Sequence, residues 1–314
     1  IKSMRKKLFI LPLFFCALRL SAAGYEVADL YQNDWINFGF VGKPKSVVHL
    51  TGKPGKDLEN FSDARFYSET DVNFNKNGYC SMIRFKDLPS EEVTFENVFS
   101  YHRQNGRRLM FSFYGREETE IFRKVFRYGA NGKIVKEEIT YPQKSSKPAD
   151  EVLYRYDEAG KLIEKTTKEI RRGRTVSVET FGYNETGVLI RKEARSLTNK
   201  KNTAVWIYDD EGRQTSYEKK DGNGSEKTVF EYADGVLSQE TGFRNGEQTF
   251  RRVYHYENGV CTAELQSDAA DRLVSIARLT YDAKGNWIRK VTYRFSEESK
   301  RIEVFQVEKR KITY

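Results

Sequence analysis

The most reactive side chains in this sequence are a few cysteines and histidines. Cys80 and Cys261 are the cysteines that follow the N-terminal segment, and the histidines are His49, His102 and His255. None of the histidines has a second ligand at the spacing of a metal site. The spacing also gives no support to a catalytic cysteine–histidine pair. We therefore expect no catalytic residue, no cofactor and no metal, and we expect that the protein is not an enzyme.

Two glycine–lysine segments, 39–43 and 52–56, share only part of the pattern of a phosphate-binding loop. Both lack the four-residue gap and the Lys-Ser/Thr ending, and Pro44 and Pro54 lie in or next to them. Adjacent acids such as Glu117 and Glu118 are typical of a charged surface. The 45 carboxylates are scattered, so the sequence indicates no acid–base pair.

The N-terminus has the three parts of a secretory signal peptide. Arg5, Lys6 and Lys7 precede the apolar run 8–18, and the small residues 21–23 follow it. The apolar run is about eleven residues, shorter than the ~20 needed to cross a bilayer as a helix. We predict cleavage between Ala23 and Gly24, to be checked by N-terminal sequencing of exported protein. Lipidation at Cys16 is an open alternative, although residues 13–15 lack the small residue expected before it.

Removal of this segment changes the net charge of the chain. The whole sequence carries +9, and loss of the five cations in residues 1–23 leaves +4. The remaining charges are interspersed in sign along the chain and form no basic block. A nucleic-acid-binding surface needs such a block, so we expect no nucleic-acid partner.

An internal repeat dominates the rest of the chain. Each unit has an aromatic residue, one free residue, a second aromatic residue, a short polar turn and a glycine, as in 154–160 and 181–187. The second aromatic residues recur every 24–28 residues, and we predict that they form the repeat core: Phe74, Tyr101, Tyr128, Tyr156, Tyr183, Tyr208, Tyr232, Tyr256 and Tyr281. Because side chains alternate along a strand, both rings of a unit lie on one face. A binding platform of exposed rings is the alternative to a buried core.

Each unit is predicted to be a β-hairpin. Asp or Asn begins the turn, and a glycine ends it where the chain needs a positive φ. The predicted turn glycines are Gly78, Gly106, Gly132, Gly160, Gly187, Gly212, Gly235, Gly259 and Gly285. The second residue after this glycine is usually apolar. Cys80 and Cys261 occupy that position, so we interpret them as small buried residues that replace leucine.

The units define the predicted domain organisation. Residues 1–23 form the signal peptide, 24–70 an N-terminal cap with the first degenerate strands, and 71–314 the array. Residues 42–48 are predicted to open the first strand, and 28–37 to form a helical or irregular cap. Polar loops at 144–147, 171–174, 198–201 and 221–224 join successive hairpins. The fold class is therefore all-β: an antiparallel hairpin array of about nine units in one long twisted or spiralling sheet.

The unit resembles the YD repeats of Rhs proteins, teneurins and insecticidal toxin shells. The matching residues are Tyr156-Asp157 with Gly160 and Leu162, Tyr208-Asp209 with Gly212, and Tyr281-Asp282 with Gly285. It is also similar to short exported bacterial proteins with YD or MORN-like units. We identify neither a C-terminal toxin domain nor the self-cleavage segment of Rhs proteins in residues 1–314, and family shells use far more repeats. The resemblance therefore implies the repeat architecture and not toxin delivery.

An outer-membrane barrel is a rival interpretation that the charge pattern disfavours. The fourth residue after the turn glycine is charged in several units, and we assign it to the face of the apolar position: Lys136, Glu164, Arg191 and Arg289. The other face carries Lys165, Lys192 and Lys290. Each mid-membrane Lys or Arg costs about 2–4 kcal/mol, so we expect a soluble array.

The function predicted from these features is an exported, non-enzymatic interaction scaffold of the periplasm, the outer-membrane surface or the extracellular space. A glycan-binding module with exposed aromatic residues is the alternative, and the partner is a protein or glycan of the envelope. An open sheet would hold Cys80 and Cys261 roughly 65 Å apart, too far for a disulfide. We therefore expect free thiols, and a bonded pair would indicate closure.

Overall fold

Nearly all of the repeat array is described by the computed structural model. It describes residues 38–314 except 103–105, 200–201, 297 and 300. The predicted signal peptide, Cys16 and the predicted cap at 28–37 lie outside the described residues.

Over the described residues the chain forms twenty antiparallel strands joined by short turns. Their bounds are β1 (Ser46–Lys53), β2 (Arg65–Phe74), β3 (Cys80–Asp87), β4 (Glu92–Tyr101), β5 (Arg108–Tyr114), β6 (Glu120–Tyr128), β7 (Ile134–Thr140), β8 (Asp150–Tyr156), β9 (Leu162–Glu169), β10 (Arg174–Tyr183), β11 (Leu189–Ser196), β12 (Thr203–Tyr208), β13 (Gln214–Asp221), β14 (Gly224–Ala233), β15 (Val236–Arg244), β16 (Glu247–Glu257), β17 (Val260–Asp268), β18 (Leu273–Tyr281), β19 (Trp287–Ser296) and β20 (Arg301–Thr313). Short 3₁₀ segments lie at η2 (Arg116–Glu118) and η3 (Ile170–Arg172). The all-β antiparallel prediction is confirmed.

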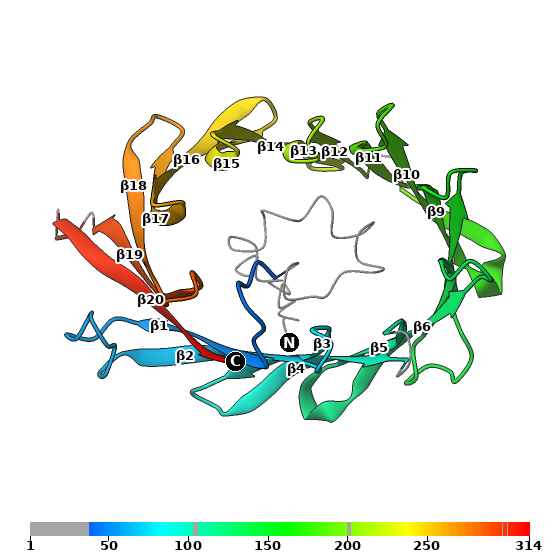
Figure 1. The fold of residues 1–314 in the computed structure, drawn as a ribbon, viewed down its shortest axis with the longest axis horizontal. Helices are drawn as coiled ribbons and strands as arrows, with labels where there is room; N and C mark the ends of the chain where they lie inside the picture. Colours follow the sequence, from blue (N-terminus) through cyan, green and yellow to red (C-terminus); the bar gives the residue numbers. More distant parts are fainter. Residues whose placement is uncertain (1–37, 103–105, 200–201, 297, 300) are drawn as a thin grey trace, which may run out of the picture.

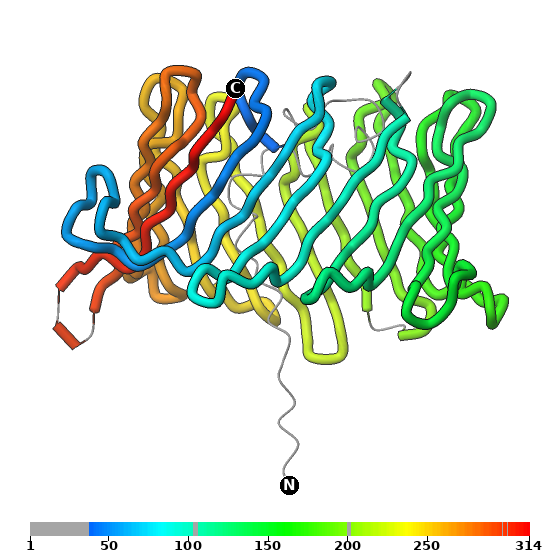
Figure 2. The backbone as a smooth tube through the Cα atoms, turned by 90° about the horizontal axis from the view of Figure 1, so that it is seen from below, coloured from blue at the N-terminus to red at the C-terminus, as the bar shows by residue number. Residues whose placement is uncertain are grey.

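The prediction of an open sheet is wrong, because the sheet closes into a barrel. β1 pairs with β2 on one side and with β20 on the other, so every strand has two neighbours. Figure 1 shows the resulting ring, and Figure 2 shows the strands tilted against its axis, as closure requires. No local turn signal joins the first strand to the last, so the repeat pattern alone could not reveal this pairing.

The nine predicted units account for the eighteen strands β2–β19, and the two ends of the chain supply a tenth pair. Ile312 on β20 pairs with Val47 on β1, as Val72 pairs with Ile83 inside the first unit. Tyr314 then occupies the place of the second aromatic residue. In the same unit, Gly42 (φ +85°) occupies the place of the turn glycine, and the fully buried Pro44 that of Cys80. The tenth unit is thus split between the chain ends.

A β-bulge lies beside the second aromatic residue of every unit. In the fourth unit Tyr156 pairs with Leu162 and Arg155 with Glu164, which leaves Ile163 as the extra residue. The other eight units shift register at the same place. A bulge bends its strand and increases the local twist, so nine equivalent bulges help to curve the sheet into a ring.

The bulge also corrects the predicted faces. The extra residue places the apolar position on the face of the aromatic residues and sends the charged fourth residue to the opposite face. The prediction that the two share a face was therefore wrong for Lys136, Glu164, Arg191 and Arg289.

The face of the aromatic residues points into the barrel. Residues 38–41 run inside the ring (Figure 1), and Phe38 and Phe40 pack edge-on against Phe74 at 5.6 and 5.9 Å between ring centroids. These residues form a core with Val47, Val72 and Cys80. Side chains alternate between the two faces along each strand, and paired residues on neighbouring strands share a face. The repeat aromatic residues therefore line the inner wall around the whole ring.

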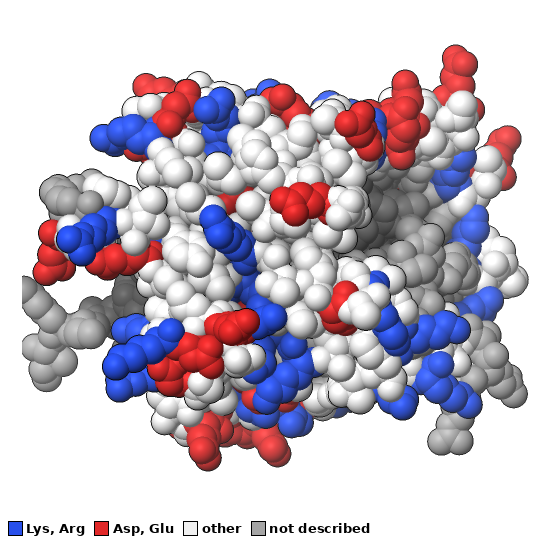
Figure 3. Space-filling model, turned by 60° about the vertical axis from the view of Figure 1, so that its left-hand side comes forward, with Lys and Arg blue, Asp and Glu red and all other residues white. Residues whose placement is uncertain are grey.

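The outer wall is polar, with acids and bases paired across neighbouring strands. Lys86 contacts Glu69 at 2.6 Å, Arg127 contacts Glu138 at 2.8 Å, and Lys136 contacts Glu151 at 2.9 Å. Figure 3 shows Lys and Arg side chains interspersed with Asp and Glu over one face of the molecule.

Candidate functional site on the inner wall

A row of tyrosines runs along the rim of the inner wall at the turn end of the hairpins. Seven of them donate the hydroxyl to the backbone carbonyl of the second residue after the turn glycine in the preceding unit, at 2.6–2.9 Å: Tyr101, Tyr128, Tyr156, Tyr183, Tyr232, Tyr256 and Tyr281. Phe74 and Tyr208 are buried, whereas these seven tyrosines are half-buried. The row thus links each hairpin to its neighbour and also faces the interior.

Burial keeps the hydroxyls of Tyr183, Tyr232, Tyr256 and Tyr281 protonated. It raises the pKa of Tyr183, Tyr232 and Tyr256 to about 12 in each case. A protonated phenol can donate its hydrogen bond, so the row holds its geometry over the ordinary pH range.

The turn glycines lie just outside this row, and all nine have positive φ. In the four-residue turns the leading Asp or Asn accepts the backbone N–H that follows the glycine; Lys161 donates to Asp157 at 2.7 Å. In the shortened units, Asp234-Gly235 and Asn258-Gly259 both have positive φ, as a type I′ turn requires. The turn, through its Asx hydrogen bond and its glycine, therefore fixes the position of each repeat aromatic residue in the inner wall.

One side of the inner wall is dominated by phenylalanines from β3 to β6. Their rings form a chain of contacts, with centroid distances of 4.1–5.8 Å: Phe85–Phe95, Phe95–Phe113, Phe113–Phe122, Phe122–Phe111 and Phe111–Phe99. We call this group, with Phe126 and Tyr154 on β6 and β8, the aromatic sector. Such contacts add about 0.5–1.5 kcal/mol per pair beyond the area buried.

The aromatic sector contains a pocket of about 280 Å³. Seven aromatic rings line it, together with the charged side chains Arg108, Lys124, Glu137 and Lys165. The Lys124 ammonium lies 3.3 Å from the Glu137 carboxylate, which also accepts the Tyr154 hydroxyl. Lys165 lies over the Tyr154 ring at 5.4 Å, and Arg108 over the Phe99 ring at 5.0 Å. Rings and charged groups therefore face one shared space.

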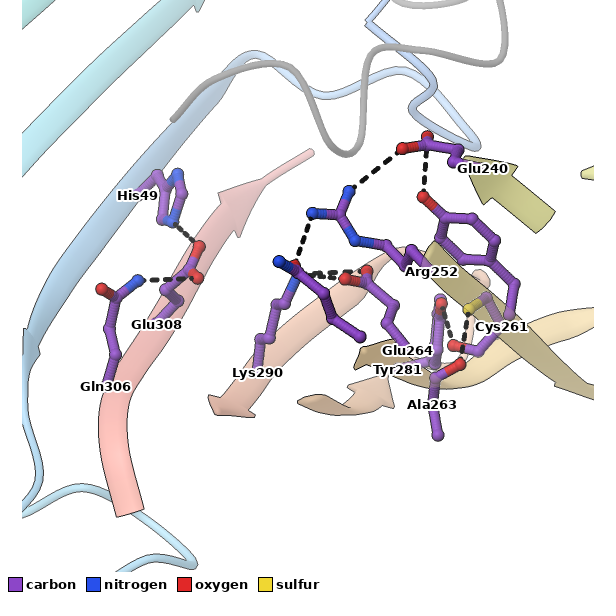
Figure 4. Close-up of polar contacts among 12 residues, drawn as sticks. His49, Glu240, Arg252, Cys261, Ala263, Glu264, Tyr281, Lys290, Gln306 and Glu308 are labelled. Atoms are coloured by element: carbon purple, nitrogen blue, oxygen red, sulfur yellow. Dashed lines mark hydrogen bonds and ion pairs between the residues drawn. The ribbon is translucent and has the colours of Figure 1, made fainter. Parts of the chain in front are cut away.

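Across the barrel, strands β15–β17, β19, β20 and β1 present the charged sector. It consists of His49, Glu240, Arg252, Glu264, Lys290, Glu308 and Arg310. The His49 imidazole lies 3.0 Å from Glu308, the Lys290 ammonium 2.8 Å from Glu264, and an Arg252 guanidinium nitrogen 3.2 Å from Glu240. Figure 4 shows these pairs. His49 and Glu308 lie on neighbouring strands, as do Arg252 and Glu240, whereas Lys290 on β19 reaches past β18 to Glu264 on β17.

The protonation states in the charged sector follow from burial and pairing. Burial lowers the pKa of His49, and Arg310 and Lys290 lower it further, against the hydrogen bond with Glu308. Burial opposes ionisation of Glu308, but the contacts with His49 and the charge of Lys290 outweigh it and lower the pKa of Glu308. Burial lowers the pKa of Arg310 to about 9. The Glu308 carboxylate is therefore ionised and paired with His49 at neutral pH.

Both cysteines take the positions predicted from the repeat. Cys80 is buried and Cys261 is half-buried, and neither forms a disulfide. Their sulfurs contact backbone carbonyls, those of Met82 and Ala263. Burial raises the pKa of Cys261 to about 11, which leaves little thiolate at neutral pH.

The histidines lie apart from one another. His49 faces the charged sector, His255 lies on the outer face of β16, and His102 follows β4. Within 38–314, apart from the gaps, no three His, Cys, Asp or Glu side chains are grouped to hold a metal ion.

Comparisons with known proteins give only distant matches. No protein-family model matches the sequence, and no curated protein matches it. Among solved structures, the complex TcdB2-TccC3-Cdc42 matches at 12% identity with a TM-score of 0.35, over 74% of this chain. TcdB2-TccC3 matches at 11% identity with a TM-score of 0.35, over 78%. This chain spans only 15–16% of those chains.

A second match has the size of this chain. A porin-like protein from Bacteroides uniformis ATCC 8492 matches at 7% identity with a TM-score of 0.37, covering 87% of this chain and 97% of the other. Similarities at this level carry no functional information. In the part of the chain that the structure describes, no helix is long and apolar enough to cross a membrane.

Sequence reasoning found the tyrosines, assigned Lys165, Lys192 and Lys290 to the wrong face, and did not single out Glu137, Glu240 and Glu264. Glu137, Lys165, Lys192, Glu240, Glu264 and Lys290 occupy the fifth residue after the turn glycine in their units. That position faces inward because of the bulge. The available signal was this recurrence of acids and bases at one repeat position, but without the bulge the position cannot be assigned to the inner wall.

Proposed function

We propose that this chain is an exported, non-enzymatic binding protein of the cell envelope or extracellular space, and that its inner wall holds the partner. The observation that carries this proposal is the pocket of about 280 Å³ in the aromatic sector, where seven rings meet four charged side chains. Binding sites typically combine apolar lining with a few polar groups in this way.

The chemistry of the inner wall supports binding over catalysis. In the charged sector each carboxylate is paired with a cation or an imidazole, as Glu240 is with Arg252, and Glu240 also accepts the Tyr254 hydroxyl. A general acid or base needs a pKa near the working pH. The lowered pKa of Glu308 moves that carboxyl away from neutral pH, and the raised pKa of Cys261 makes that thiol a poor nucleophile.

The outer wall supports an aqueous setting for the protein. Lys136, Arg127 and Lys86 lie on that wall in mid-sheet ion pairs. A lipid-facing wall would bury such charges at about 2–4 kcal/mol each. The recurring hairpin with its Asx turn and glycine supports membership of the wider YD-repeat class. We do not extend toxin delivery to this chain.

A glycan is the second candidate partner, and the same pocket favours it. Aromatic faces with neighbouring charged groups suit the apolar faces and hydroxyls of sugars. The two candidate functions, an envelope scaffold and a glycan-binding module, differ in the partner but use the same inner wall.

The test compares two cations on one strand. Lys124 faces inward from β6, and Arg127 faces outward from the same strand. The full chain and the variants Lys124→Gln and Arg127→Gln are immobilised and exposed to envelope extracts and to a glycan panel. We expect Lys124→Gln alone to lose captured partners. Loss of capture in Arg127→Gln with retention in Lys124→Gln would show that the outer wall binds.

A further inference from the structure

We propose that two copies of this chain dimerise edge to edge through the part of β20 that extends beyond the ring, residues 301–306, which we call the overhang. This inference goes beyond the proposed function, because it does not require the inner wall to bind a partner. It assigns an interaction surface at one rim and the register in which a second copy occupies it.

The overhang exists because β20 is longer than the strand that closes the ring against it. β20 has 13 residues and β1 has 8, and their pairing ends at Gly52 and Val307. Beyond that point the overhang lies against β19 alone. Figure 2 shows this hairpin, in red, projecting past one rim of the ring. Among the described strands, none pairs with the opposite edge of the overhang. An unpaired edge is a template for another strand.

A bulge decides which backbone groups point to this open edge. The Thr313 carbonyl accepts the Lys45 N–H, so every second residue of β20 above the overhang directs its N–H and C=O to β1. Phe305 is an extra residue of β20 relative to β19, and it shifts this alternation by one. Within the overhang, Ile302 and Val304 therefore direct their backbone groups to the open edge.

The sequence of the overhang is complementary to itself. In an antiparallel pair centred on Ile302, that residue lies opposite its own copy, and Arg301 of each copy lies opposite Glu303 of the other. Opposite charges placed directly across two strands stabilise the pair. A register centred on Glu303 would oppose two acids, and one centred on Val304 would place Glu303 opposite Phe305. The charges therefore favour a second copy centred on Ile302.

The same register joins two exposed apolar patches. Phe295 on β19 pairs with Ile302, and the two side chains are 45% and 59% exposed. Since directly paired residues share a face, the dimer aligns Phe295 and Ile302 of one copy with Ile302 and Phe295 of the other across four strands. Such a contact uses the same patch on both copies, as two-fold dimers do.

Sedimentation equilibrium tests the dimer. We use protein concentrations from about 1 µM to about 1 mM, because so short a contact gives a weak dimer. The parent should shift from monomer to dimer across this range. Glu303→Arg and Arg301→Glu should each weaken the dimer about tenfold or more, since each places like charges opposite one another twice. Lys311→Glu, an exposed position of β20 inside the ring, is the matched control and should dimerise like the parent.

A mixture of the two charge variants tests the register. One copy then carries arginine at positions 301 and 303 and the other carries glutamate at both, so opposite charges face each other again. We expect the equimolar mixture of Glu303→Arg and Arg301→Glu to dimerise at least as strongly as the parent. Under oxidising conditions Ile302→Cys should form a bonded dimer. Phe295→Cys should not, because its two copies lie three strand spacings apart, about 14 Å.

Three results would overturn the proposal: a parent that stays monomeric over the whole range, charge variants that dimerise like the parent, or a mixture that does not recover the dimer. A monomeric parent, together with a loss of captured partners in Ile302→Pro, would assign the edge to an extended peptide instead of a second copy. None of these results tests the inner wall, so the proposed function stands or fails separately.

Discussion

The tyrosine hydroxyls are the most regular side-chain contact of this protein. The Tyr183 hydroxyl donates to the Leu162 carbonyl at 2.8 Å, and the ring faces the inner wall. One side chain thereby connects two hairpins and lines the interior. The sequence left two interpretations of the aromatic residues open, a buried core and a binding platform, and Tyr183 has features of both.

Substitutions of Tyr183 separate the hydroxyl from the ring. Tyr183→Phe should lower the free energy of unfolding by about 1 kcal/mol, the net value of one hydrogen bond. Tyr183→Ala should cost about 3–5 kcal/mol, because it also removes the ring. Urea denaturation measures both. Tyr67→Phe, which alters an exposed hydroxyl, is the control and should lie within about 0.5 kcal/mol of the parent. A Tyr183→Ala protein as stable as the parent would contradict a core role.

His49 makes stability depend on pH. Its pKa in the folded protein is lowered by burial, with Arg310 and Lys290 acting in the same direction and Glu308 against them, while the Trp287 ring packs at 5.3 Å. The unfolded chain therefore binds a proton more readily than the folded one. The stabilising contribution is present above the unfolded pKa of about 6.5 and is lost as pH falls below it.

We expect the melting temperature to fall between about pH 7 and pH 5, within the range where an unfolded histidine gains its proton. His49→Gln should flatten this part of the curve, since glutamine does not titrate. His255→Gln, on the outer wall, is the control and should keep the parent slope. Glu308, whose pKa is also lowered, contributes a separate loss at pH below its ordinary value. An unchanged slope in His49→Gln would refute the role of this imidazole.

At the scale of the hairpin, the unit could be predicted because its signals are local. The Asx turn with its glycine and the aromatic–x–aromatic spacing depend on a few neighbouring residues, as in 154–160. The bulge at Ile163 could not be predicted, since no residue type specifies it and its evidence is the pairing with β8. The faces of Lys165 and Glu164, and with them the charged half of the candidate site, were therefore out of reach.

Turn and strand glycines should respond oppositely to substitution. Gly160 has φ +78°, so Gly160→Val forces a β-branched residue into a left-handed conformation and should cost about 1–3 kcal/mol. Gly182 lies in β10 without positive φ, and an added Cβ would meet Arg191 at an ordinary 3.7 Å. Gly182→Ala should therefore be neutral or stabilising by up to about 1 kcal/mol. Thermal melts of both variants check this, and equal losses would show that turn geometry is not the cause.

At the scale of the whole molecule, closure of the sheet shortens the expected distance between Cys80 and Cys261, but the two thiols still lie too far apart for a disulfide. Cys80 on β3 and Cys261 on β17 are six strands apart by the shorter way around the ring, through β20 and β1. At ~4.8 Å per strand this is about 29 Å along the wall. A disulfide needs Cα atoms within about 7 Å. Closure therefore leaves the thiols apart, because the ring closes at twenty strands.

Both thiols should therefore be free in the exported protein. Alkylation under denaturing, non-reducing conditions should modify two cysteines, as read by intact mass. In the native protein Cys261 should react slowly near pH 8, since burial raises its pKa to about 11. Cys261→Ser serves as the control, with one modified residue. An unmodified, bonded pair would contradict the twenty-strand ring.

The seam between β1 and β20 also sets the order of events in folding. Its contacts join residues about 260 positions apart, such as Val47 and Ile312, whereas every other neighbouring pair of strands is consecutive in sequence. Folding slows as contacting residues become more distant along the chain. The ring cannot close until the last strand has formed, so we expect closure to be the slow step. A circular permutant with its ends in the 144–147 loop, and residues 38 and 314 joined by a linker, makes the β1–β20 pairing local but turns the β7–β8 pairing into the long-range seam. Closure then still joins the two ends of the chain, so the permutant should refold at about the parent rate in stopped-flow fluorescence; much faster refolding would mean that the β1–β20 pairing itself, and not closure, limits folding.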